Sequence, residues 1–528
     1  MRAFNQPGRS AIYANNAAMA TSHPLATHVG LQALQEGGSA IDACIAATAV
    51  LSIAEPAMTG IGGDCFALIG RSGEPIAALN GSGYSPNQAT REAAMAQGLD
   101  KIPTHSPWSI TVPGAVAAWE QLHKDYGKLS WQRILQPAID YAQQGVPIHE
   151  RVALDWQTYQ QDLLKDADTA ELYLNDGHAY LEGEIFKQAK LAQTLTCIAQ
   201  QGASAFYTGP IAEDIVNKLN RLGGCHQLED FAYQLNLGED MYVQPVAQDF
   251  QGVTLWECPP NGQGITAQVI VAIMANFNVA SLDQTNYHHL LAEATKLAYQ
   301  LRDNCISDPT FMGYTAEEIL HPEFIKNLAA NINMQQATPT PASLFPNHKD
   351  TIYLCCVDQD GLNVSFINSI FNPFGSAISA PESGILLQSR GASFNLHKDH
   401  ANALAPRKRP MHTIIPAMLT KADRIVGPLG VVGGHYQACG HAHVLNLMLN
   451  FGHPAQAALD APRSFAYEDK LSIESSMAAE VIEGLRDKGH IITVDDTPMG
   501  GGQCILRLAN GVLQAASDPR KDGLALGY

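Results

Sequence analysis

The spacing of hydrophobic residues changes along the chain and separates helical regions from strand-rich ones. Between residues 30 and 57 apolar side chains recur every three or four positions, which predicts helices. The Gly-Gly-Ser run at 37–39 predicts the end of one helix and the cap of the next. A glycine-rich turn at 59–63 is then expected to enter a short strand at 65–69.

The middle of the chain is predicted to be mostly helical. A helical pattern with polar faces runs from residue 112 to about residue 209. Residues 230–254 are typical of strands, and 259–264 form a loop that precedes a helix at 265–275. A second amphipathic helix is expected at 288–303.

After a polar, proline-rich stretch, strands and turns alternate. A strand at 351–357, a turn at 358–361 and a strand at 362–368 predict a hairpin. Further helices are expected at 441–451 and 478–488, and a closing strand pair, 503–508 and 511–516, precedes a polar C-terminus. Helices around paired strand layers favour an α+β fold with four layers, α/β/β/α.

Composition and charge narrow the function classes. The 528 residues are 46% hydrophobic and 16% charged, so the chain can bury a large core. The formal net charge of −19 argues against nucleic acid or an anionic membrane as a partner, and the short basic cluster at 407–409 is expected to be solvated or locally paired. The first residues lack the apolar run of a secretory signal, and the ten cysteines are dispersed, so a cytoplasmic protein is expected.

Thr351 is the main candidate for chemistry. The stretch at 331–350 is predicted to be a flexible linker that delivers this threonine to the start of a buried strand. Cleavage between Asp350 and Thr351 would give one residue a hydroxyl nucleophile and a free α-amine, with a pKa of about 8, as its base. The alternative is that Thr351 merely begins a strand, as β-branched residues often do.

Other polar or glycine-rich positions could complete a site. Gly433 and Gly434 could present backbone N–H groups to an oxyanion, although a glycine pair is also common in tight turns. Asp64 and Arg91 could face a polar substrate, and the guanidinium suits a carboxylate, although an isolated arginine is often a surface residue. The histidines at 435, 441 and 443 have no standard metal-ligand spacing, so no metal site is predicted.

Many ordered segments together resemble the γ-glutamyltranspeptidase family of N-terminal-nucleophile hydrolases. They extend over nearly the whole chain and include Gly375 and residues 20–27, 37–43, 55–56, 60–63, 112–114, 206–209, 259–260, 383–387, 408–410, 433–434, 460–463 and 517–520. The resemblance implies an αββα sandwich whose catalysis needs no metal or cofactor. It also implies cleavage into a large fragment, residues 1–350, and a small fragment, residues 351–528, which form one structural domain.

The same resemblance implies roles for individual residues. Thr351 is expected to be the nucleophile and cleavage site, and Ser369 to hydrogen-bond it. Gly433 and Gly434 fall on the oxyanion pair, and Arg91 aligns with the arginine that grips the substrate carboxylate. The fragments are expected to form a heterodimer, with further dimerisation left open.

Departures from the family pattern point away from ordinary γ-glutamyl recognition. Phe371 replaces an asparagine, Arg390 and Ser393 replace polar or acidic residues, and His412 with Thr413 replaces paired serines. This pattern resembles the branch that includes oxamate amidohydrolase, and the loss of the acid that would hold an α-ammonium favours a small carboxylate-bearing amide such as oxamate. The alternatives are hydrolysis or transfer of glutathione or another γ-glutamyl compound, and a non-enzymatic binding protein that remains one chain.

Overall fold

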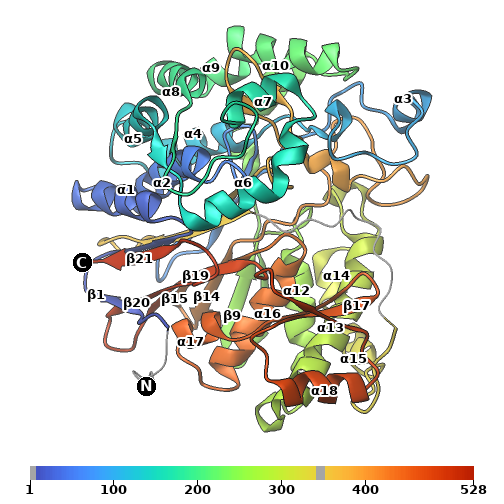
Figure 1. Cartoon of the computed structure of the whole chain (residues 1–528). Helices are drawn as coiled ribbons and strands as arrows, with labels where there is room; N and C mark the ends of the chain where they lie inside the picture. The colour runs from blue at the N-terminus through green and yellow to red at the C-terminus, as the bar shows by residue number, and fades with distance from the viewer. Residues whose placement is uncertain (1–7, 340–350) are drawn as a thin grey trace.

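Two stacked β-sheets covered by helices on both outer faces form the protein. The computed structural model describes residues 8–339 and 351–528. Each main sheet has seven strands, and the order from top to bottom of the molecule is helices, sheet, sheet, helices (Figure 1). This arrangement confirms the predicted α+β class and the four-layer αββα sandwich.

The first sheet carries the strand that begins after Thr351. Its neighbouring strands are all antiparallel. In spatial order they are β21 (Leu524–Gly527), β2 (Ala18–Thr21), β10 (Ile352–Val357), β11 (Asn363–Ser369), β3 (Asp64–Gly70), β4 (Ala77–Gly81) and β7 (Tyr242–Val243). Strands from both predicted fragments therefore share one sheet, with the β10–β11 hairpin inserted between β2 and β3.

The second sheet is also antiparallel, and its strand β15 ends directly before the glycine pair. Its strands are β1 (Ile12–Ala14), β20 (Leu513–Ser517), β19 (Gly501–Arg507), β15 (Arg424–Val432), β14 (Ala417–Lys421), β9 (Val253–Glu257) and β8 (Val246–Phe250). Smaller sheets pair β5 (Val146–Pro147) with β6 (Ile185–Phe186), β12 (Ser379–Ala380) with β13 (Ile385–Leu386), and β16 (Ser464–Tyr467) with β17 (Lys470–Glu474) and β18 (Ile492–Asp495).

Alternating side chains of β10 show how the layers are held together. Ile352 and Leu354 pack into the core beneath the first helical layer, whereas Tyr353 and Cys355 pack between the two sheets. Every residue of β10 is buried. A strand that is apolar on both faces is therefore required where a sheet lies between another sheet and helices.

Each helical layer covers one sheet. Over the first sheet and its surroundings lie α1 (Pro24–Gln35), α2 (Ala40–Ala54), α3 (Arg91–Ala96), α4 (Ala115–Tyr126), α5 (Trp131–Gln144), α6 (Glu150–Leu163), α7 (Ala167–Tyr173), α8 (Ala189–Gln201), α9 (Ser204–Tyr207), α10 (Pro210–Arg221) and α11 (Leu228–Leu235) (Figure 1). On the other side of the molecule lie α12 (Gly264–Met274), α13 (Gln284–Cys305), α14 (Ala316–Ile319), α15 (Pro322–Ala329), α16 (Tyr436–Leu449), α17 (Ala455–Asp460) and α18 (Ala479–Asp487).

Most predicted elements are confirmed, but two predictions are wrong and several helices, among them α3, α14 and α15, were not predicted. The break at 37–39 is real, because Ser39 caps α2 in a capping box with Asp42. The prediction of strands over 230–254 is wrong at its start, where α11 buries Phe231 and has its own capping box. The helix α17 was missed, and the C-terminus predicted as polar instead forms the edge strand β21.

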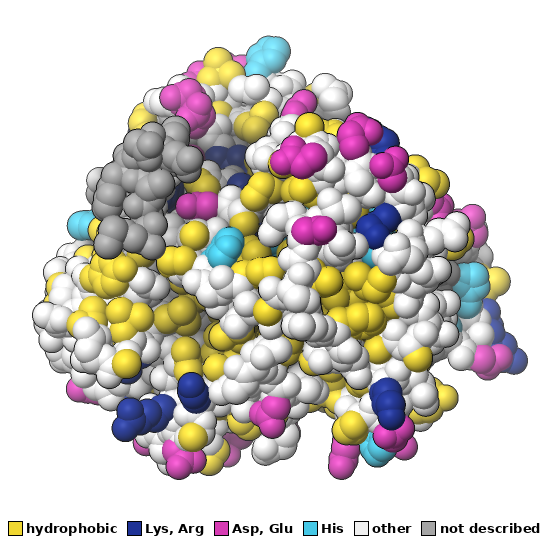
Figure 2. All heavy atoms as spheres, turned by 90° about the horizontal axis from the view of Figure 1, so that it is seen from below, with side chains coloured by type: hydrophobic (Ala, Val, Ile, Leu, Met, Phe, Trp, Pro, Cys, Tyr) yellow, Lys and Arg dark blue, Asp and Glu magenta, His cyan; other side chains and the backbone are white. Residues whose placement is uncertain are grey.

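The structure tests the prediction for the basic cluster at 407–409 but only part of the predicted linker at 331–350. The basic cluster is locally paired: Arg407 reaches Asp230, and the Lys408 ammonium bonds the carbonyl oxygens of Ala401 and Ala403. On the face shown in Figure 2, the described lysines and arginines lie scattered among acidic and hydrophobic side chains. Residues 340–350 of the predicted linker lie outside the described residues. Within the described ranges no helix is long and apolar enough to cross a membrane.

Candidate active site

Thr351 lies where three neighbouring strands of the first sheet meet at one end. It immediately precedes β10, and the register that pairs Ile352 with Asn368 brings it beside Ser369, the last residue of β11. Ser369 in turn lies opposite Asp64, the first residue of β3. Thr351 is fully buried, and its Oγ1 donates a hydrogen bond of 2.8 Å to Ser369 Oγ.

A buried arginine is the next member of this group. Arg390 belongs to a short 3₁₀-helix, Arg390–Ser393, and its side chain has no exposed surface. Its Nη2 donates to Ser369 Oγ at 3.2 Å and its Nη1 donates to Thr413 Oγ1 at 2.8 Å. The guanidinium also lies 4.1 Å from the centre of the Phe371 ring. The guanidinium thus connects the Thr413 hydroxyl with the Ser369 hydroxyl, which is the partner of Thr351.

Phe371 has a backbone role as well as a ring role. Its φ of 79° lies in the left-handed region, which a bulky side chain rarely adopts. This conformation turns its N–H toward Ser369 Oγ, to which it donates at 3.0 Å. The Ser369 hydroxyl therefore accepts from Thr351, Arg390 and this amide, and backbone strain at such a place is typical of a functional site.

Asp64 supplies the negative charge nearest to Arg390. Its Oδ1 accepts from the backbone N–H groups of Gly83 at 3.0 Å and Gly114 at 3.1 Å, and its Oδ2 lies 3.0 Å from His412 Nε2. Burial raises the pKa of Asp64 to about 6, against the opposing charge of Arg390 and these hydrogen bonds. At neutral pH the carboxyl is therefore mostly ionised, and it becomes protonated when the pH falls below about 6.

Burial also lowers the pKa values of the other two titratable groups, Arg390 and His412. Burial lowers the pKa of Arg390 to about 9 in spite of Asp64, so the guanidinium keeps its charge at pH 7. Burial, and then the charge of Arg390, hold the pKa of His412 well below its usual range. His412 is consequently a neutral hydrogen-bond donor to Asp64, and the group carries one positive and one negative charge.

The glycine pair is attached to this group through Gln263. Gln263 Nε2 donates to the carbonyl oxygens of Thr413 at 2.9 Å and Gly434 at 3.0 Å, so it ties the segment beside Arg390 to the glycine loop. Gly433 and Gly434 have φ values of 125° and 58°. A Cβ on Gly433 would come within 2.9 Å of Gly500 Cα, so both the conformation and the close approach require glycine there.

Packing between the sheets brings the glycine loop toward Thr351. Gly433 follows directly after β15 of the second sheet. The strand β10 of the first sheet packs against β15 where the two sheets face each other. A Cβ on Gly430 would lie only 2.3 Å from the Tyr353 ring, so the start of β10 and the end of β15 are in direct contact. This placement is compatible with an oxyanion site formed by the loop beside the threonine.

A cavity of about 610 Å³ is lined in part by residues that are close in sequence to the arginine. It is lined by Asn372 and Ala392, which are close in sequence to Phe371 and Arg390, and by Lys101 and His105 from the loop after α3. This volume is in the range of small-molecule sites and offers more room than a two-carbon amide needs.

The structure assembles most of the predicted site residues and places one elsewhere. Thr351, Ser369, Phe371, Arg390, His412 and Thr413 are connected directly or through Asp64. Ser393 supports the group indirectly, because its hydroxyl bonds the carbonyl oxygens of Arg390 and Met411.

Arg91 lies apart from the hydrogen-bonded group around Thr351 among the described contacts, and its expected grip on the substrate carboxylate stays a prediction. It begins the six-residue helix α3, which turns Ala94 inward, and its guanidinium pairs with the exposed Glu92 at 2.8 Å. The guanidinium beside Thr351 belongs to Arg390 instead.

Several residues of the group carried no usable sequence signal. Gln263 and Gln388 each bridge segments that are far apart in the chain, and a single glutamine has no recognisable pattern. Gln388 Nε2 donates to Asp64 Oδ1 at 3.0 Å. Asp64 itself had one weak signal, its place after a glycine-rich turn.

The three histidines near the glycine pair have separate partners. His435 Nδ1 lies 3.0 Å from Arg302 Nη1, His441 Nδ1 lies 2.7 Å from Glu257, and His443 Nδ1 lies 2.9 Å from the Tyr287 hydroxyl. They do not converge on one point, in agreement with the expectation that they are structural.

Comparison with known proteins gives consistent matches over the whole chain. The sequence model described as Gamma-glutamyltranspeptidase matches residues 26–528. The chain is 36% identical to the glutathione hydrolase-like YwrD proenzyme of Bacillus subtilis, over 96% of this chain and 97% of that protein. It is 35% identical to the oxamate amidohydrolase proenzyme of Klebsiella pneumoniae, again over 96% and 97%.

A solved structure shows the same fold. The cephalosporin acylase from Bacillus halodurans superimposes with a TM-score of 0.93 at 36% sequence identity, covering 100% of this chain and 99% of that one. Both sequence relatives are proenzymes by name, and the matches cover nearly the whole length of all three relatives.

Proposed function

The chain belongs to the γ-glutamyltranspeptidase family, and from that premise we propose that it is a self-cleaving threonine amidohydrolase whose substrate is a small amide with a carboxylate on its acyl part. Oxamate is the smallest substrate of this description. Thr351 is the nucleophile and the first residue of the small fragment in this proposal, and the two fragments remain together as a heterodimer in the cytoplasm.

One observation carries the proposal: a buried guanidinium lies one hydroxyl away from the nucleophile. Arg390 donates to the same Ser369 oxygen that accepts from Thr351. Its Nε is buried without a hydrogen-bond partner among the described residues, so the side chain has donor capacity left. A carboxylate is the natural acceptor for such a fork, because two parallel N–H···O bonds match its geometry.

The proposed reaction uses few groups. After cleavage before Thr351, its α-amine takes the hydroxyl proton while Oγ1 bonds to the amide carbonyl carbon. The N–H groups of Gly433 and Gly434 stabilise the oxyanion, and the intermediate collapses by breaking the C–N bond as the leaving nitrogen takes that proton. Water then attacks the ester and releases the acid, which restores the threonine.

The printed names of the relatives support cleavage of a bond between an acyl carbon and nitrogen. One relative is an amidohydrolase of oxamate, one a glutathione hydrolase-like protein and one a cephalosporin acylase. They differ in the size of the acyl group, so they leave the substrate to be argued from this chain's own site.

Glutathione hydrolysis is the second candidate, and the name of the glutathione hydrolase-like YwrD proenzyme favours it. A γ-glutamyl donor carries an α-ammonium, which needs an anion beside it in a buried pocket. The anion found here, Asp64, already accepts four hydrogen bonds from the protein, including those from Gln388 and His412. Around Ser369 and Arg390 the described groups are mainly hydrogen-bond donors. Such a surrounding favours an acyl group that carries a carboxylate and no ammonium group.

A paired assay separates the two candidates. Purified protein is incubated with oxamate and with glutathione, and ammonia and glutamate are measured, with Thr351→Ala as the control for contaminating activity. We expect ammonia from oxamate and little glutamate from glutathione. Release of glutamate alone would reject the small-amide proposal, and an unprocessed chain inactive on both would favour a binding protein.

A further inference from the structure

Gln263 lies directly before α12, and its side chain does not cap that helix. A polar side chain at this position commonly accepts a hydrogen bond from the first turn, but Gln263 makes no such bond. The side chain is fully buried. Burying an amide is unfavourable unless its donors and its acceptor are bonded elsewhere in the protein. The bonds that Gln263 does make therefore indicate its role.

The oxygen and the NH₂ group of the Gln263 amide are bonded to three other segments. Its Oε1 accepts from Arg302 Nη1 at 2.8 Å. Its Nε2 donates to the carbonyl oxygens of Thr413 at 2.9 Å and Gly434 at 3.0 Å. A guanidinium only donates and a carbonyl only accepts, so these partners fix which end of the amide faces which segment. An ionised glutamate of the same shape could accept from Arg302 but could not donate to either carbonyl, so the position requires an amide.

The bond to Gly434 holds a loop whose backbone donors are available. Among the described residues, the N–H groups of Gly433 and Gly434 donate no hydrogen bond, while their carbonyl oxygens accept from the start of α16. The following residue is held as well, because the Tyr299 hydroxyl donates to the His435 carbonyl oxygen and Arg302 Nη1 lies 3.0 Å from His435 Nδ1. Two available N–H groups on a fixed loop are what a developing oxyanion requires.

The bond to Thr413 connects Gln263 with the arginine beside the nucleophile. The carbonyl oxygen of Thr413 accepts from Gln263, while its hydroxyl oxygen accepts from Arg390 Nη1 at 2.8 Å. The backbone N–H of Gln263 also donates to the His412 carbonyl oxygen at 2.8 Å, so the two segments are joined by backbone as well. One buried amide therefore links the guanidinium that is proposed to bind the substrate carboxylate with the loop that is proposed to bind the oxyanion.

We propose that Gln263 is a positioning residue that sets the distance between Arg390 and the glycine loop, and so selects amides whose carboxylate adjoins the scissile carbonyl. The inference rests on the proposed function, from which it takes both binding roles. In oxamate the carboxylate carbon is bonded directly to the amide carbonyl carbon. The two anchors must then lie at one fixed separation, and an error of about 1 Å can lower the rate about 100-fold. Gln263 acts through Thr413 and Gly434 and needs no contact with the substrate.

The test compares oxamate with malonamate, which has one methylene between its carboxylate and its amide carbonyl. Wild-type protein should prefer oxamate roughly tenfold or more in kcat/KM, the range that one methylene gives. Gln263→Glu keeps the shape and the acceptor for Arg302 but loses the two donors. Its kcat/KM should fall roughly 30-fold for oxamate and roughly threefold for malonamate, so the preference falls about tenfold. Rates are divided by the amount of small fragment on a denaturing gel, and a folding defect would lower both equally.

A second variant, Thr413→Val, breaks the same link at another bond. It keeps the backbone carbonyl that accepts from Gln263 but removes the hydroxyl that accepts from Arg390. The preference for oxamate should fall here too, roughly three- to tenfold. The double variant with Gln263→Glu should lose no more preference than the worse single variant, because both changes interrupt one chain of contacts. Thr413→Val alone decides the question if Gln263→Glu protein does not fold.

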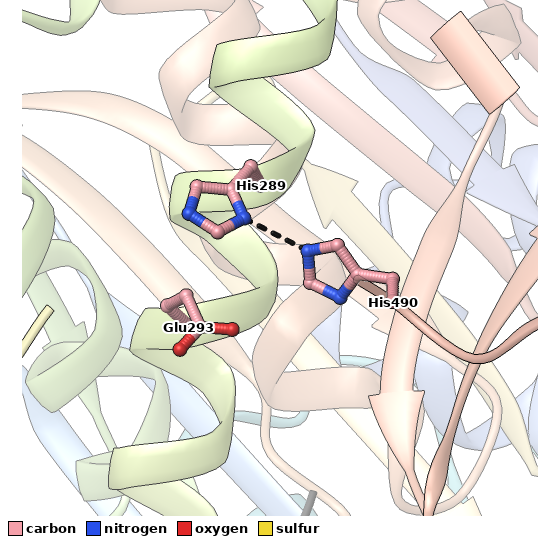
Figure 3. Close-up of side chains that lie close together, drawn as sticks. All are labelled: His289, Glu293 and His490. Carbon is pink, nitrogen blue, oxygen red and sulfur yellow. Dashed lines mark hydrogen bonds between the residues drawn. The ribbon is translucent and has the colours of Figure 1, made fainter. Parts of the chain in front are cut away.

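The matched control is Glu293→Gln, on α13 but outside this chain of contacts. His289, Glu293 and His490 point toward one another, with 2.8 Å between His289 Nδ1 and His490 Nε2 (Figure 3). Glu293 is only 2% exposed and pairs with Lys296 at 2.6 Å. The substitution is therefore the reverse exchange of acid and amide at a similarly buried position. It should lower stability and leave the preference for oxamate unchanged.

Three results would overturn the inference while leaving the proposed function intact. They are an unchanged preference in Gln263→Glu or in Thr413→Val, an equal loss of preference in Glu293→Gln, and wild-type protein that hydrolyses malonamate as well as oxamate. Wild-type protein that is inactive on both amides would reject the proposed function instead.

Discussion

Two fully buried arginines are connected to Gln263, Arg302 directly and Arg390 through Thr413, and their surroundings differ. Arg302 on α13 is surrounded by compensating groups: its Nε donates to Asp303 at 2.7 Å, its Nη1 donates to Gln263 Oε1 at 2.8 Å, and it lies 4.2 Å from the centre of the Tyr299 ring. Arg390 has two hydroxyl acceptors and an aromatic ring, with a carboxylate nearby but no ion pair within the described residues.

The electrostatic consequences run in opposite directions. The charge of Asp303 overcomes burial and raises the pKa of Arg302, whereas burial prevails at Arg390 and lowers its pKa. Arg302 is thus a satisfied ion pair that anchors Gln263, which in turn holds the glycine loop. Arg390 is a positive charge that the fold tolerates without fully neutralising, and such a charge is expected where an anionic ligand supplies the missing partner.

The largest expected effect is on stability and separates the two arginines. Arg302→Met leaves Asp303 largely buried without its partner and should lower the free energy of unfolding by about 3–5 kcal/mol. Arg390→Met removes a charge that burial disfavours but also takes the nearest positive charge from the buried Asp64, so the loss should be smaller, about 1–2 kcal/mol. Urea unfolding of both variants at pH 7 measures this, and an equal loss at the two positions would remove the distinction.

The second effect is on substrate capture. Arg390→Lys keeps the charge but loses the planar fork, so kcat/KM for oxamate should fall roughly 100-fold, equivalent to about 2.7 kcal/mol. Steady-state kinetics with Arg91→Lys as the control should show no comparable loss, since Arg91 pairs with Glu92 on an exposed helix. A larger loss at Arg91 than at Arg390 would restore the original assignment of the carboxylate-binding arginine.

A third variant tests the link between the arginine and the nucleophile. Ser369→Ala removes the oxygen that accepts from both Thr351 and Arg390, so kcat should fall roughly tenfold with a smaller change in KM. Ser393→Ala is a useful comparison because that hydroxyl bonds only backbone carbonyl oxygens among the contacts described above. If the two variants lose kcat equally, Ser369 has no special connection to the nucleophile.

The smallest effect is a pH dependence that Asp64 imparts to Arg390. With a pKa of about 6, Asp64 is ionised at pH 7 and competes with the substrate for the positive charge of Arg390. As the pH falls from 7 to 5 the carboxyl becomes neutral, so KM for oxamate should fall roughly threefold. In Asp64→Asn the KM should be low and nearly constant over this range. A KM that rises in acid in both proteins would exclude this coupling.

Much of the fold was accessible from the sequence because local signals and tertiary structure agree. The two strand-like runs around the turn at 358–361 and the Gly-Gly-Ser break before α2 reflect the same burial that the structure shows. The error at residues 230–235 has a physical cause: the capping box of α11 is a weaker signal than the β-prone residues that follow it. The strand β21 escaped notice because edge strands carry little apolar pattern.

The site was only partly accessible for a different reason. Thr351 was indicated by its place at the start of the predicted hairpin, whereas Ser369 was assigned only by the family resemblance. Arg390, by contrast, became the central arginine only through tertiary contacts with Ser369 and Thr413, which lie 21 and 23 residues away. Arg91 carried the same chemical signal in the sequence but is half-buried and pairs with its neighbour Glu92. The sequence shows that both residues are arginines, but only the folded structure shows which guanidinium is buried beside the Thr351 group.

The most direct test of the account is N-terminal sequencing of the small fragment from purified wild-type protein, with Thr351→Ala analysed in parallel. The account predicts two wild-type fragments, the smaller beginning Thr-Ile-Tyr-Leu, and a single intact chain from the variant. A wild-type chain that stays intact after prolonged incubation, or a small fragment that begins at another residue, would contradict the claim that Thr351 is the nucleophile.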